Sequence, residues 1–481
     1  MIDKKLIDEK FSVLPLRGNT PEEEKKGVVY FIGIGGIGMS ALARFFAAQG
    51  IRVSGYDKTP TPLTTELEGI GIPVHYEDRP DLAPRDADLV VYTPAIPADH
   101  QELVYYRNHD YKVVKRSDVL QLITESSFNI CIAGTHGKTT ITTMTAHLLR
   151  DSGFGCNAFL GGISVNYGTN FWSSERNVCV VEADEYDRSF LKLSPDIAVI
   201  TAMDPDHLDI YGTPEAVEQA FIDFSARVRP GGLLIRQWAL KRGNALKAPQ
   251  ELTYSLQNSN ASIYATNLQV KEGSYHFDVV IEGRVIKNLV LNMGGLHNVE
   301  NALAAIGVAS SLEIDDDRIR KGVSSFKGVK RRFEYILRNR HLVYIDDYAH
   351  HPEELKALIN GARSLFGQCK CTIIFQLHLY TRTKDLADEF AAALDLADET
   401  ILLPIYPARE LPIPGVTSTM VTERMKTGAP VVKTRQELLK WVEEEYGRRT
   451  SENGERILIT AGAGDIDTLV TPIKNILNDL T

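Results

Sequence analysis

Apolar runs and amphipathic stretches alternate along the first part of the chain. The run VVYFIGIG (28–35) predicts a buried strand, and MSALARFFAAQG (39–50) has the spacing of a helix that ends at a glycine. IRVSGYD (51–57) and ADLVVYTPAI (87–96) predict two further strands. Strands that alternate with helices predict a mostly parallel, doubly wound sheet, which is an α/β fold.

The same rhythm starts again in the middle of the chain. FNICIAG (128–134) predicts a strand, and the helical pattern that follows it closes at Gly153. NVCVVEADE (177–185) and DIAVITAMDPDH (196–207) predict strands that end in acidic residues and histidine. Because ligands of open α/β sheets bind at the carboxyl ends of strands, these two strand ends point to one site.

A third section has the same pattern of strands followed by polar turns. It contains HLVYIDDYAHHPEE (341–354), TIIFQLHLYTRT (372–383) and RILITAGAGD (456–465), and the Pro-rich YPARELPIPG (406–415) predicts a surface loop. At about 150 residues per domain, a chain of this length predicts about three domains. We place them at 1–122, 123–334 and 335–481.

Composition narrows the class of protein. With 43% hydrophobic and 24% charged residues the chain is globular, and its net charge of −10 argues against binding nucleic acid. The five cysteines are few and odd in number, which favours reduced, buried thiols. No run of about 18 apolar residues occurs, and the N-terminus lacks an apolar signal core, so we expect a soluble, cytoplasmic protein.

The central glycine loop has the features of a phosphate-binding loop. GTHGKTT (134–140) follows a predicted buried strand and opens a helix, where backbone N–H groups and the helix dipole attract phosphate. Lys138 would reach the β- and γ-phosphates of ATP, and the Thr139 hydroxyl would ligate Mg²⁺. The loop departs from the full Walker pattern because Ala133 stands where its first glycine would be. The alternative is a structural turn that binds nothing.

Two strand-end residues are candidate metal ligands. Glu182 offers the hard oxygen that Mg²⁺ prefers, and His207 follows a neighbouring predicted strand. Taken singly, the alternatives are a solvated strand-end carboxylate for Glu182 and an ordinary structural histidine for His207. Beside the phosphate loop, both are more plausibly ligands.

The first glycine loop, FIGIGGIGMS (31–40), matches G-x-G-x-x-G at Gly33, Gly35 and Gly38. Such glycines allow the backbone to approach a pyrophosphate closely. Asp57 ends the second predicted strand, where a dehydrogenase uses an acid to bind the ribose of NAD. The alternatives for this loop are therefore an NAD site and a purely structural turn.

Seven motifs in one order resemble the Mur ligase family of bacterial cell-wall synthesis, and the resemblance covers about 28 to about 470. They are GTHGKTT, EADEYDRSFL (182–191), DPDHLDIYG (204–212), HNVENALAA (297–305), RRFE (331–334), DDYAHHPEE (346–354) and FQLHLYTRT (375–383). GIGGIGMS and the last two motifs are most similar to the branch of the family that uses L-alanine.

The resemblance implies three domains: a Rossmann-like domain for a UDP-sugar, a central P-loop ATPase-like domain and a Rossmann-like domain for the amino acid. It implies a ligase of peptidoglycan synthesis that joins L-alanine to the carboxylate of UDP-N-acetylmuramate, with ATP and Mg²⁺, through an acyl phosphate. The oligomeric state stays open.

The resemblance also implies roles for residues. Catalysis would involve Lys138, His207 and Arg332, and the metal would bind Thr139, Glu182 and His207. ATP would contact Gly134, Thr135, His136, Gly137, Lys138, Thr139, Thr140, Asn298, Asn301, Arg332 and Asp347. The UDP-sugar would contact Gly33, Gly35, Gly36, Gly38, Met39, Ser40 and Asp57, and the amino acid Tyr348, His350, His378 and Arg382.

Several of these assignments have alternatives. Arg331 would serve in place of Arg332, or either would form an exposed salt bridge; Asn298 would instead cap a helix; and His351 competes with His350. The family pattern has proline where Leu377 stands, and many members have arginine where Leu379 stands, which bears on alanine recognition. Related ligases also carry a carbamylated lysine near the metals, and we predict none in this chain.

Three other functions compete with this interpretation. A related recycling ligase joins a ready-made tripeptide to the same UDP-sugar, but its third-domain motif lacks H-x-Y-T-R-T. An NAD-dependent oxidoreductase leaves the phosphate loop, Glu182 and His207 unexplained. A nucleotide-sensing protein without catalysis is disfavoured by the intact Lys138, Thr139 and Glu182.

Overall fold

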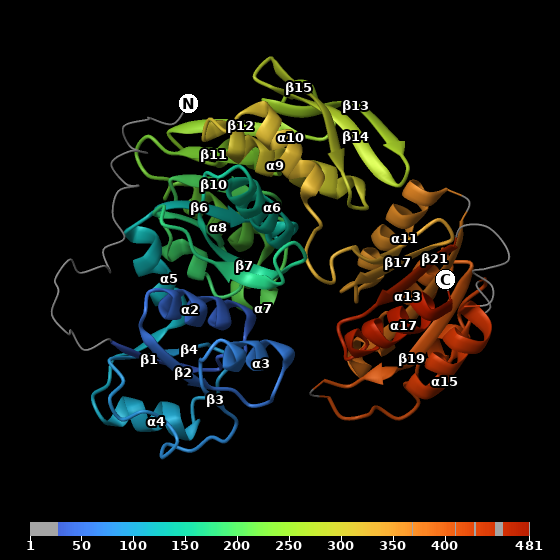
Figure 1. The fold of residues 1–481 in the computed structure, drawn as a ribbon, viewed down its shortest axis with the longest axis horizontal. Helices are drawn as coiled ribbons and strands as arrows, with labels where there is room; N and C mark the ends of the chain where they lie inside the picture. The colour runs from blue at the N-terminus through green and yellow to red at the C-terminus, as the bar shows by residue number, and fades with distance from the viewer. Residues whose placement is uncertain (1–26, 368, 409, 428–429, 448–455, 481) are drawn as a thin grey trace. The chain divides into compact units, whose positions relative to one another are not determined.

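The computed structural model describes residues 27–367, 369–408, 410–427, 430–447 and 456–480 (Figure 1). The N-terminal stretch, where we expected no signal core, lies outside the described residues. The chain forms two compact units. Unit 1 runs to Asn267 and includes Phe277–Leu289 and Glu300–Phe326, whereas unit 2 comprises Leu268–His276, Val290–Val299 and the described residues from Lys327 onward.

Unit 1 begins with a five-stranded parallel sheet in the order β3-β2-β1-β4-β5. Its strands are β1 Val28–Ile32, β2 Arg52–Tyr56, β3 Val74–His75, β4 Leu89–Tyr92 and β5 Val113–Lys115. Its helices are α2 Ile37–Ala48, α3 Pro62–Gly69, α4 Gln101–Asn108 and α5 Arg116–Glu125. The strand order reverses between β1 and β4, so a crevice for a ligand is expected where β1 ends.

The second sheet has ten strands in the order β15-β14-β13-β12-β11-β10-β6-β9-β7-β8. They are β6 Phe128–Ala133, β7 Asn157–Ser164, β8 Thr169–Trp172, β9 Val178–Glu182, β10 Ile197–Ile200, β11 Leu233–Gln237, β12 Gln250–Ser255, β13 Ile263–Lys271, β14 Ser274–Ile281 and β15 Arg284–Leu291. Helical segments are α6 Lys138–Asp151, η1 Ser189–Lys192, α7 Leu208–Tyr211, α8 Pro214–Ser225, η2 Gly243–Ala245, α9 Leu296–Ser311 and α10 Asp316–Ser325. Because β6 lies between β9 and β10 and is parallel to both, the residues that follow these three strands meet at one edge.

Unit 2 holds a six-stranded sheet in the order β16-β17-β21-β18-β19-β20, in which β16 alone is antiparallel to its neighbour. The strands are β16 Glu334–Arg338, β17 Leu342–Asp347, β18 Lys370–His378, β19 Glu399–Tyr406, β20 Val431–Val432 and β21 Arg456–Ala461. The helices are α11 Pro352–Phe366, α12 Tyr380–Asp385, α13 Ala387–Leu394, α14 Thr419–Thr422, α15 Arg435–Trp441 and α17 Asp467–Leu480, with a π-helical turn at Val442–Tyr446. The predicted α/β class is confirmed by these three sheet-containing regions.

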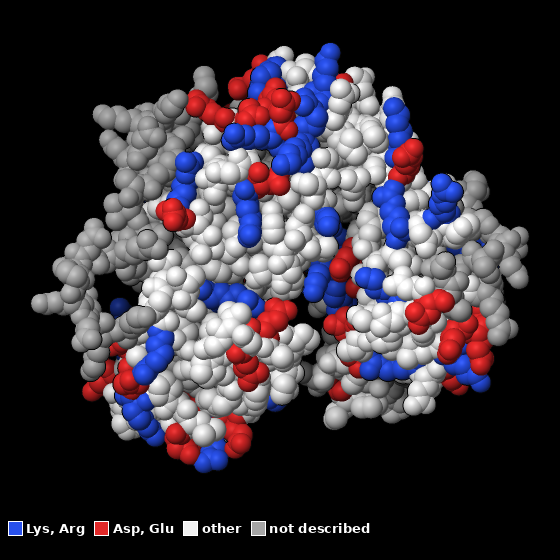
Figure 2. Space-filling model, viewed as in Figure 1, with Lys and Arg blue, Asp and Glu red and all other residues white. Residues whose placement is uncertain are grey.

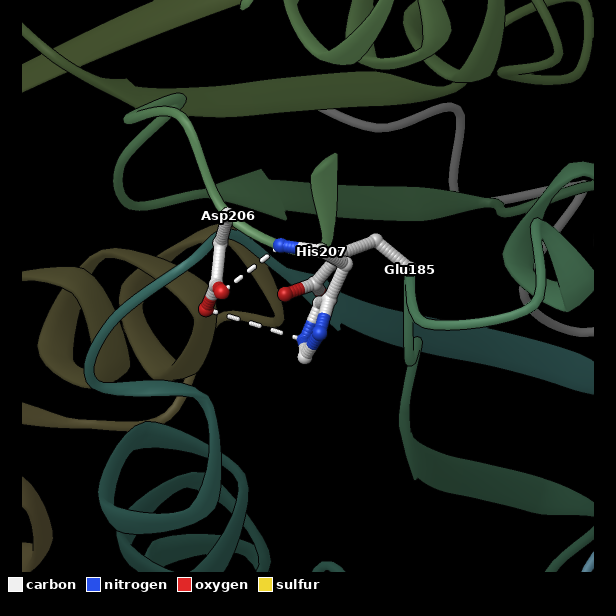
Figure 3. Close-up of side chains that lie close together, drawn as sticks. All are labelled: Glu185, Asp206 and His207. Carbon is white, nitrogen blue, oxygen red and sulfur yellow. Dashed lines mark hydrogen bonds and ion pairs between the residues drawn. The ribbon is translucent and has the colours of Figure 1, made fainter. Parts of the chain in front are cut away.

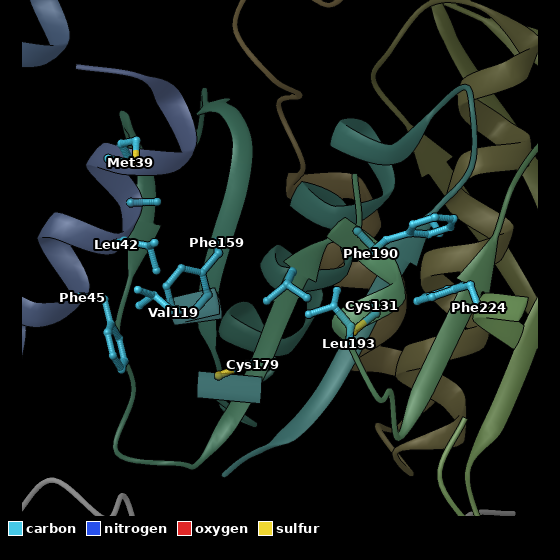
Figure 4. Packing of buried hydrophobic residues seen from close by; sticks show 14 of the residues in the cluster. Met39, Leu42, Phe45, Val119, Cys131, Phe159, Cys179, Phe190, Leu193 and Phe224 are labelled. Carbon is cyan, nitrogen blue, oxygen red and sulfur yellow. The ribbon is translucent and has the colours of Figure 1, made fainter. Parts of the chain in front are cut away.

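A single apolar cluster joins the two sheets of unit 1. Phe45 of α2 packs against Phe159 and Phe171 of β7 and β8, with ring centroids 5.4 and 6.0 Å away (Figure 4). The amide of Asn170 in β8 also donates to the Ile37 carbonyl at 2.6 Å. The first glycine loop and α2 are therefore fixed against the central sheet.

The surface and the cysteines agree with the composition. On the face in Figure 2, acidic and basic side chains are interspersed. The five cysteines are free thiols, and four of them are buried. Among the described residues, no helix is long and apolar enough to cross a membrane.

Candidate active site

The central loop connects β6 to α6 through two glycines with positive φ. Gly134 has φ 132°, and Gly137 has φ 78° where it caps α6. A Cβ on Gly134 would lie 2.9 Å from the backbone nitrogens of Thr201 and Ala202, and one on Gly137 would lie 2.7 Å from Asn301 Oδ1. The loop has no room for side chains at these positions, so its backbone stays open to an anion.

Lys138 begins α6 and points back across the loop. Its Nζ donates to the Gly134 carbonyl at 2.7 Å and to Glu185 Oε1 at 2.8 Å. Glu185 is buried, and Tyr211 Oη donates to its carbonyl at 2.6 Å. Glu185 belongs to the motif EADEYDRSFL but had no predicted role, although its place just after β9 was a signal. Lys138 thus has an anionic partner at the position where we expected phosphate.

The three predicted metal ligands separate into two groups. Thr139 Oγ1 donates to Glu182 Oε1 at 3.1 Å, so these two oxygens lie next to each other at the start of α6. His207 instead groups with Glu185 and Asp206, whose nearest ligand atoms all lie within 4.8 Å of one another (Figure 3). His207 has φ 52°, and its ring makes a T-shaped contact with Tyr186 at 5.0 Å. Carboxylates fit Mg²⁺, while the imidazole also fits softer divalent cations.

The remaining loop residues have differing surroundings. Thr135 Oγ1 accepts from the Asp204 backbone N–H at 3.2 Å, and the exposed His136 ring lies 3.4 Å from the Asp204 carboxylate. The Thr201 hydroxyl donates to the His136 carbonyl. Thr140 has a buried side chain in α6. The segment that follows β10 therefore holds this loop in shape through Thr201 and Asp204.

The two asparagines of α9 behave differently. Asn298 Nδ2 donates to the Gly294 carbonyl at 2.6 Å and so holds the turn before the helix. Asn298 lies within α9 and acts there as a donor, which is a different contact from the helix cap considered as its alternative role. Asn301 faces Gly137 of the phosphate loop. Of the pair, Asn301 lies at the loop that would hold ATP.

The first loop turns sharply after β1. Gly33 has φ 89°, and the N–H groups of Gly33 and Ile34 donate to the Tyr56 carbonyl at 2.8 and 2.9 Å. The Gly35 N–H donates to Asp57 Oδ2 at 2.7 Å. Asp57 therefore lies beside the first glycine loop, directly after β2, and its carboxylate fixes the conformation of that loop.

The predicted residues that open α2 differ in exposure. Gly36 caps the helix and is exposed, whereas the side chains of Met39 and Ser40 are buried. Ser40 Oγ donates to the Ile37 carbonyl at 3.0 Å and accepts from Asn170 Nδ2 at 2.9 Å. These side chains pack the helix, so at the start of α2 it is the backbone, and not these two side chains, that is open to an anion.

In unit 2, the two arginines of RRFE are distinguished by their partners. Arg331 donates to the Gly462 carbonyl and lies 3.4 Å from the Asp346 carboxylate. Arg332 is exposed, and no ion pair joins it to another described residue. Asp347 accepts from the Phe333 and Ala349 backbone N–H groups at 2.6 and 2.7 Å. Arg332 is therefore the arginine that has its charge available.

Four residues predicted to bind the amino acid gather where β17 and β18 end. The His350 ring lies 5.3 Å from the Tyr348 ring and 6.1 Å from the His378 ring, whereas His351 is exposed at the start of α11. Nδ1 of His378 and Nη1 of Arg382 are buried without a hydrogen-bond partner among the described residues. Buried donors and acceptors normally find partners, so these two atoms mark a place for a polar ligand.

Burial and neighbouring positive charge act on both histidines. Burial lowers the pKa of His350, with a further lowering from Arg382. Burial also lowers the pKa of His378, and the charge of Arg382 adds to the shift. Both rings are therefore neutral near pH 7 and able to accept a proton.

The two departures from the family pattern lie beside this cluster. Leu377 is fully buried in β18, where the register with β19 shifts between Gln376 and His378. Leu379 precedes α12 with φ 72° and ψ 135°. Residues other than glycine adopt this backbone conformation at a cost of about 1–3 kcal/mol. The strain lies at the turn that positions Arg382.

Three family models match almost the whole described chain. Residues 28–127 match the Mur ligase family catalytic domain, 132–309 the Mur ligase middle domain and 331–464 the glutamate ligase domain of Mur ligases. The chain belongs to the Mur ligase family. The resemblance of its motifs is thereby confirmed.

Curated relatives match over nearly their full length. The UDP-N-acetylmuramate–L-alanine ligase of Phocaeicola vulgatus is 46% identical over 94% of this chain and 98% of its own. That of Porphyromonas gingivalis is 44% identical over 94% and 99%. Among solved structures, the UDP-N-acetylmuramate-alanine ligase of Thermotoga maritima has a TM-score of 0.79 at 28% identity and covers 94% of this chain and 99% of its own.

Proposed function

We propose that the chain is an ATP-dependent ligase that joins L-alanine to the carboxylate of UDP-N-acetylmuramate in peptidoglycan precursor synthesis. The observation that carries this proposal is the match over 94% of the chain to curated ligases of that name. We retain domain bounds at 1–122, 123–334 and 335–481 as part of the proposal, with the UDP-sugar, ATP and amino acid assigned in that order.

The chemistry requires activation of a carboxylate. An amine does not displace oxide from a carboxylate, so the γ-phosphoryl group of ATP is first transferred to a muramoyl carboxylate oxygen and ADP leaves. The alanine nitrogen then attacks the carbonyl carbon, and phosphate departs as the C–N bond forms. Positioning two anions against each other and compensating their charge is the main task of such a site.

The phosphate loop and the strand ends around it supply this compensation. Lys138 would exchange Glu185 for the β- and γ-phosphates, since its Nζ already lies over the loop. Thr139 and Glu182 would hold Mg²⁺, and Glu185, Asp206 and His207 a second cation. When bound, Mg²⁺ neutralises charge on the phosphates. Arg332, Asp347 and Asn301 complete our assignment for ATP.

The cluster of unit 2 suits a small amino acid. A guanidinium binds a carboxylate through two parallel hydrogen bonds, and the buried Nη1 of Arg382 has no hydrogen-bond partner in the described part of the chain. The neutral imidazoles of His350 and His378 accept a proton from the alanine ammonium, which must lose one before its nitrogen attacks.

Phosphate release tests the proposal directly. The chain is incubated with ATP, Mg²⁺ and UDP-N-acetylmuramate, with either L-alanine or L-alanyl-γ-D-glutamyl-meso-diaminopimelate. We expect release that requires L-alanine and a product heavier by one alanyl residue, with Lys138→Met as an inactive control. Release with the tripeptide alone would assign the recycling reaction, and no release from folded protein would leave only nucleotide binding.

A further inference from the structure

A pocket at the carboxyl end of β9 is lined by a basic residue, Arg116, that belongs to none of the sequence motifs. It is lined by Arg116 and Ser117 from the start of α5, by Glu182 and Asp184, and by Phe190 and Leu193 around η1. Arg116 is the basic residue of this lining, which also includes the two acidic residues Glu182 and Asp184. Glu182 also contacts Thr139, so the pocket adjoins the first turn of the ATP-binding helix.

Arg116 also contacts the first glycine loop. A Cβ placed on Gly38 would lie 3.2 Å from Arg116 Cζ and 3.3 Å from its Cδ. The missing side chain at Gly38 therefore allows the guanidinium to lie against the first turn of α2. Arg116 sits between the two glycine loops, at the first and beside the metal ligands of the second.

The position of Arg116 is fixed by its neighbours in unit 1. Lys192 of η1 donates to Ser117 Oγ at 3.2 Å and pairs with Asp118, which also accepts from the Lys115 N–H at 3.0 Å. These contacts hold the start of α5 against the segment after Glu182. Because α2 is itself held to β8, both sides of the guanidinium are anchored.

The charge of Arg116 has no partner among the residues that the structure describes. No hydrogen bond or ion pair joins its half-buried side chain to another residue in the described part of the chain. A guanidinium presents N–H groups in a planar fork that matches phosphate oxygens, and the N-terminus of α2 adds a positive dipole beside it. An anion at this helix start would otherwise face the carboxylates of Glu182 and Asp184 directly.

We propose that Arg116 binds the diphosphate of the UDP-sugar and completes the anion site of the first glycine loop. The proposal rests on the proposed function for the identity of the sugar nucleotide. By holding the diphosphate at the Glu182 side of the loop, Arg116 positions the muramoyl carboxylate toward Thr139. It is a binding and positioning residue for the ligase reaction.

Titration calorimetry on the full chain with UDP and with uridine tests this role without turnover. We expect Arg116→Ala to weaken UDP binding about 10- to 100-fold, the range for hydrogen bonds to charged groups, and to leave uridine binding unchanged. Arg116→Lys, which keeps the charge and loses the fork, should fall between. Arg52→Ala is the matched control. This exposed arginine begins β2, whereas the first glycine loop contacts Tyr56 at the other end of the strand, and its side chain pairs with Asp86.

Steady-state kinetics supply the second measurement. The KM for UDP-N-acetylmuramate should rise in Arg116→Ala, while the KM values for ATP and L-alanine stay within about twofold. Equal affinity of wild type and Arg116→Ala for UDP would overturn the inference. So would an equal loss for uridine, which would indicate a disturbed fold, or a loss confined to UDP-N-acetylmuramate, which would assign Arg116 to the muramoyl carboxylate.

The two proposals fail separately. If wild type binds UDP more tightly than Arg116→Ala does, and yet no phosphate is released with L-alanine, the ligase proposal fails and the diphosphate site stands. If L-alanine drives phosphate release and Arg116→Ala retains wild-type affinity for UDP, the role of Arg116 alone is refuted.

Discussion

Alanine substitutions at three glycines around α6 separate backbone strain from loss of the ATP site. Gly153 follows the helix with φ 76° and has no atom within 4 Å of an added Cβ. Gly137 precedes the helix with φ 78°, but its Cβ would lie 2.7 Å from Asn301 Oδ1. Gly134 has φ 132°, and its Cβ would meet the backbone of Thr201 and Ala202 at 2.9 Å.

The costs follow from these surroundings. A left-handed backbone costs an L-residue about 1–2 kcal/mol, so Gly153→Ala and Gly137→Ala should lose similar stability. At about 2–4 °C per kcal/mol, unit 1 would melt about 2–8 °C earlier in each. Gly134→Ala adds about 1–3 kcal/mol of overpacking, because its Cβ would meet backbone atoms of Thr201 and Ala202, whose backbones are hydrogen-bonded to the loop, whereas the Cβ at Gly137 would meet a side chain.

The variants should diverge in catalysis. We expect Gly153→Ala to keep the wild-type KM for ATP, and Gly137→Ala to raise it about 10-fold, because one phosphate contact is lost and Asn301 is displaced. Scanning calorimetry and phosphate release at varied ATP give both quantities. Equal KM values in these two variants at equal melting temperatures would refute the assignment of the loop to phosphate.

Three further predictions concern charged side chains. Glu185→Gln should weaken Mn²⁺ binding about 10-fold or more, measured by electron paramagnetic resonance, because it removes a charged ligand beside Asp206. Arg382→Lys should raise the KM for L-alanine about 10-fold and leave that for ATP unchanged in the phosphate assay, since lysine lacks the fork. Burial raises the pKa of Asp346 from 3.8 to about 7, so its contribution to the stability of unit 2 is complete below its unfolded pKa and is lost as pH rises to about 7. Asp346→Asn should flatten that fall in urea titrations between pH 4 and pH 8.

The fold class and the glycine turn between β6 and α6 could be predicted because both are encoded locally. A buried strand, two glycines and an amphipathic helix follow one another in the chain, so periodicity and turn chemistry suffice. The same reasoning anticipated that the residues after β9 and β10 would meet, since parallel strands end at one edge. It also assigned the cluster of Tyr348, His350, His378 and Arg382 to a different sheet from the glycine turn before α6.

Residue roles that depend on packing between distant segments were not predictable. Glu185 stands three places after Glu182 in one motif. Its pairing with Lys138 is seen only in the structure, where the Lys138 side chain reaches back across the loop. Arg116 lies in no motif, and its role appears only once α5 and α2 are packed together. Met39 and Ser40 belong to the first motif, yet their side chains turn into the core because α2 packs on the central sheet.

The charges around the ATP loop explain why a carboxylate-rich site suits anionic substrates. Glu182 and Glu185 lie at the end of β9, where ATP and a UDP-sugar would bring further negative charge together. Lys138 compensates the carboxylate of Glu185, and on the proposed assignment it would lose that partner on turning to a phosphate. A divalent cation held by Glu185, Asp206 and His207 would then supply positive charge beside Glu185, while Arg116, as we propose, compensates the diphosphate beside Glu182. The carboxylates would thus couple cation binding to ATP binding, because an unpaired charge is costly in a partly buried site.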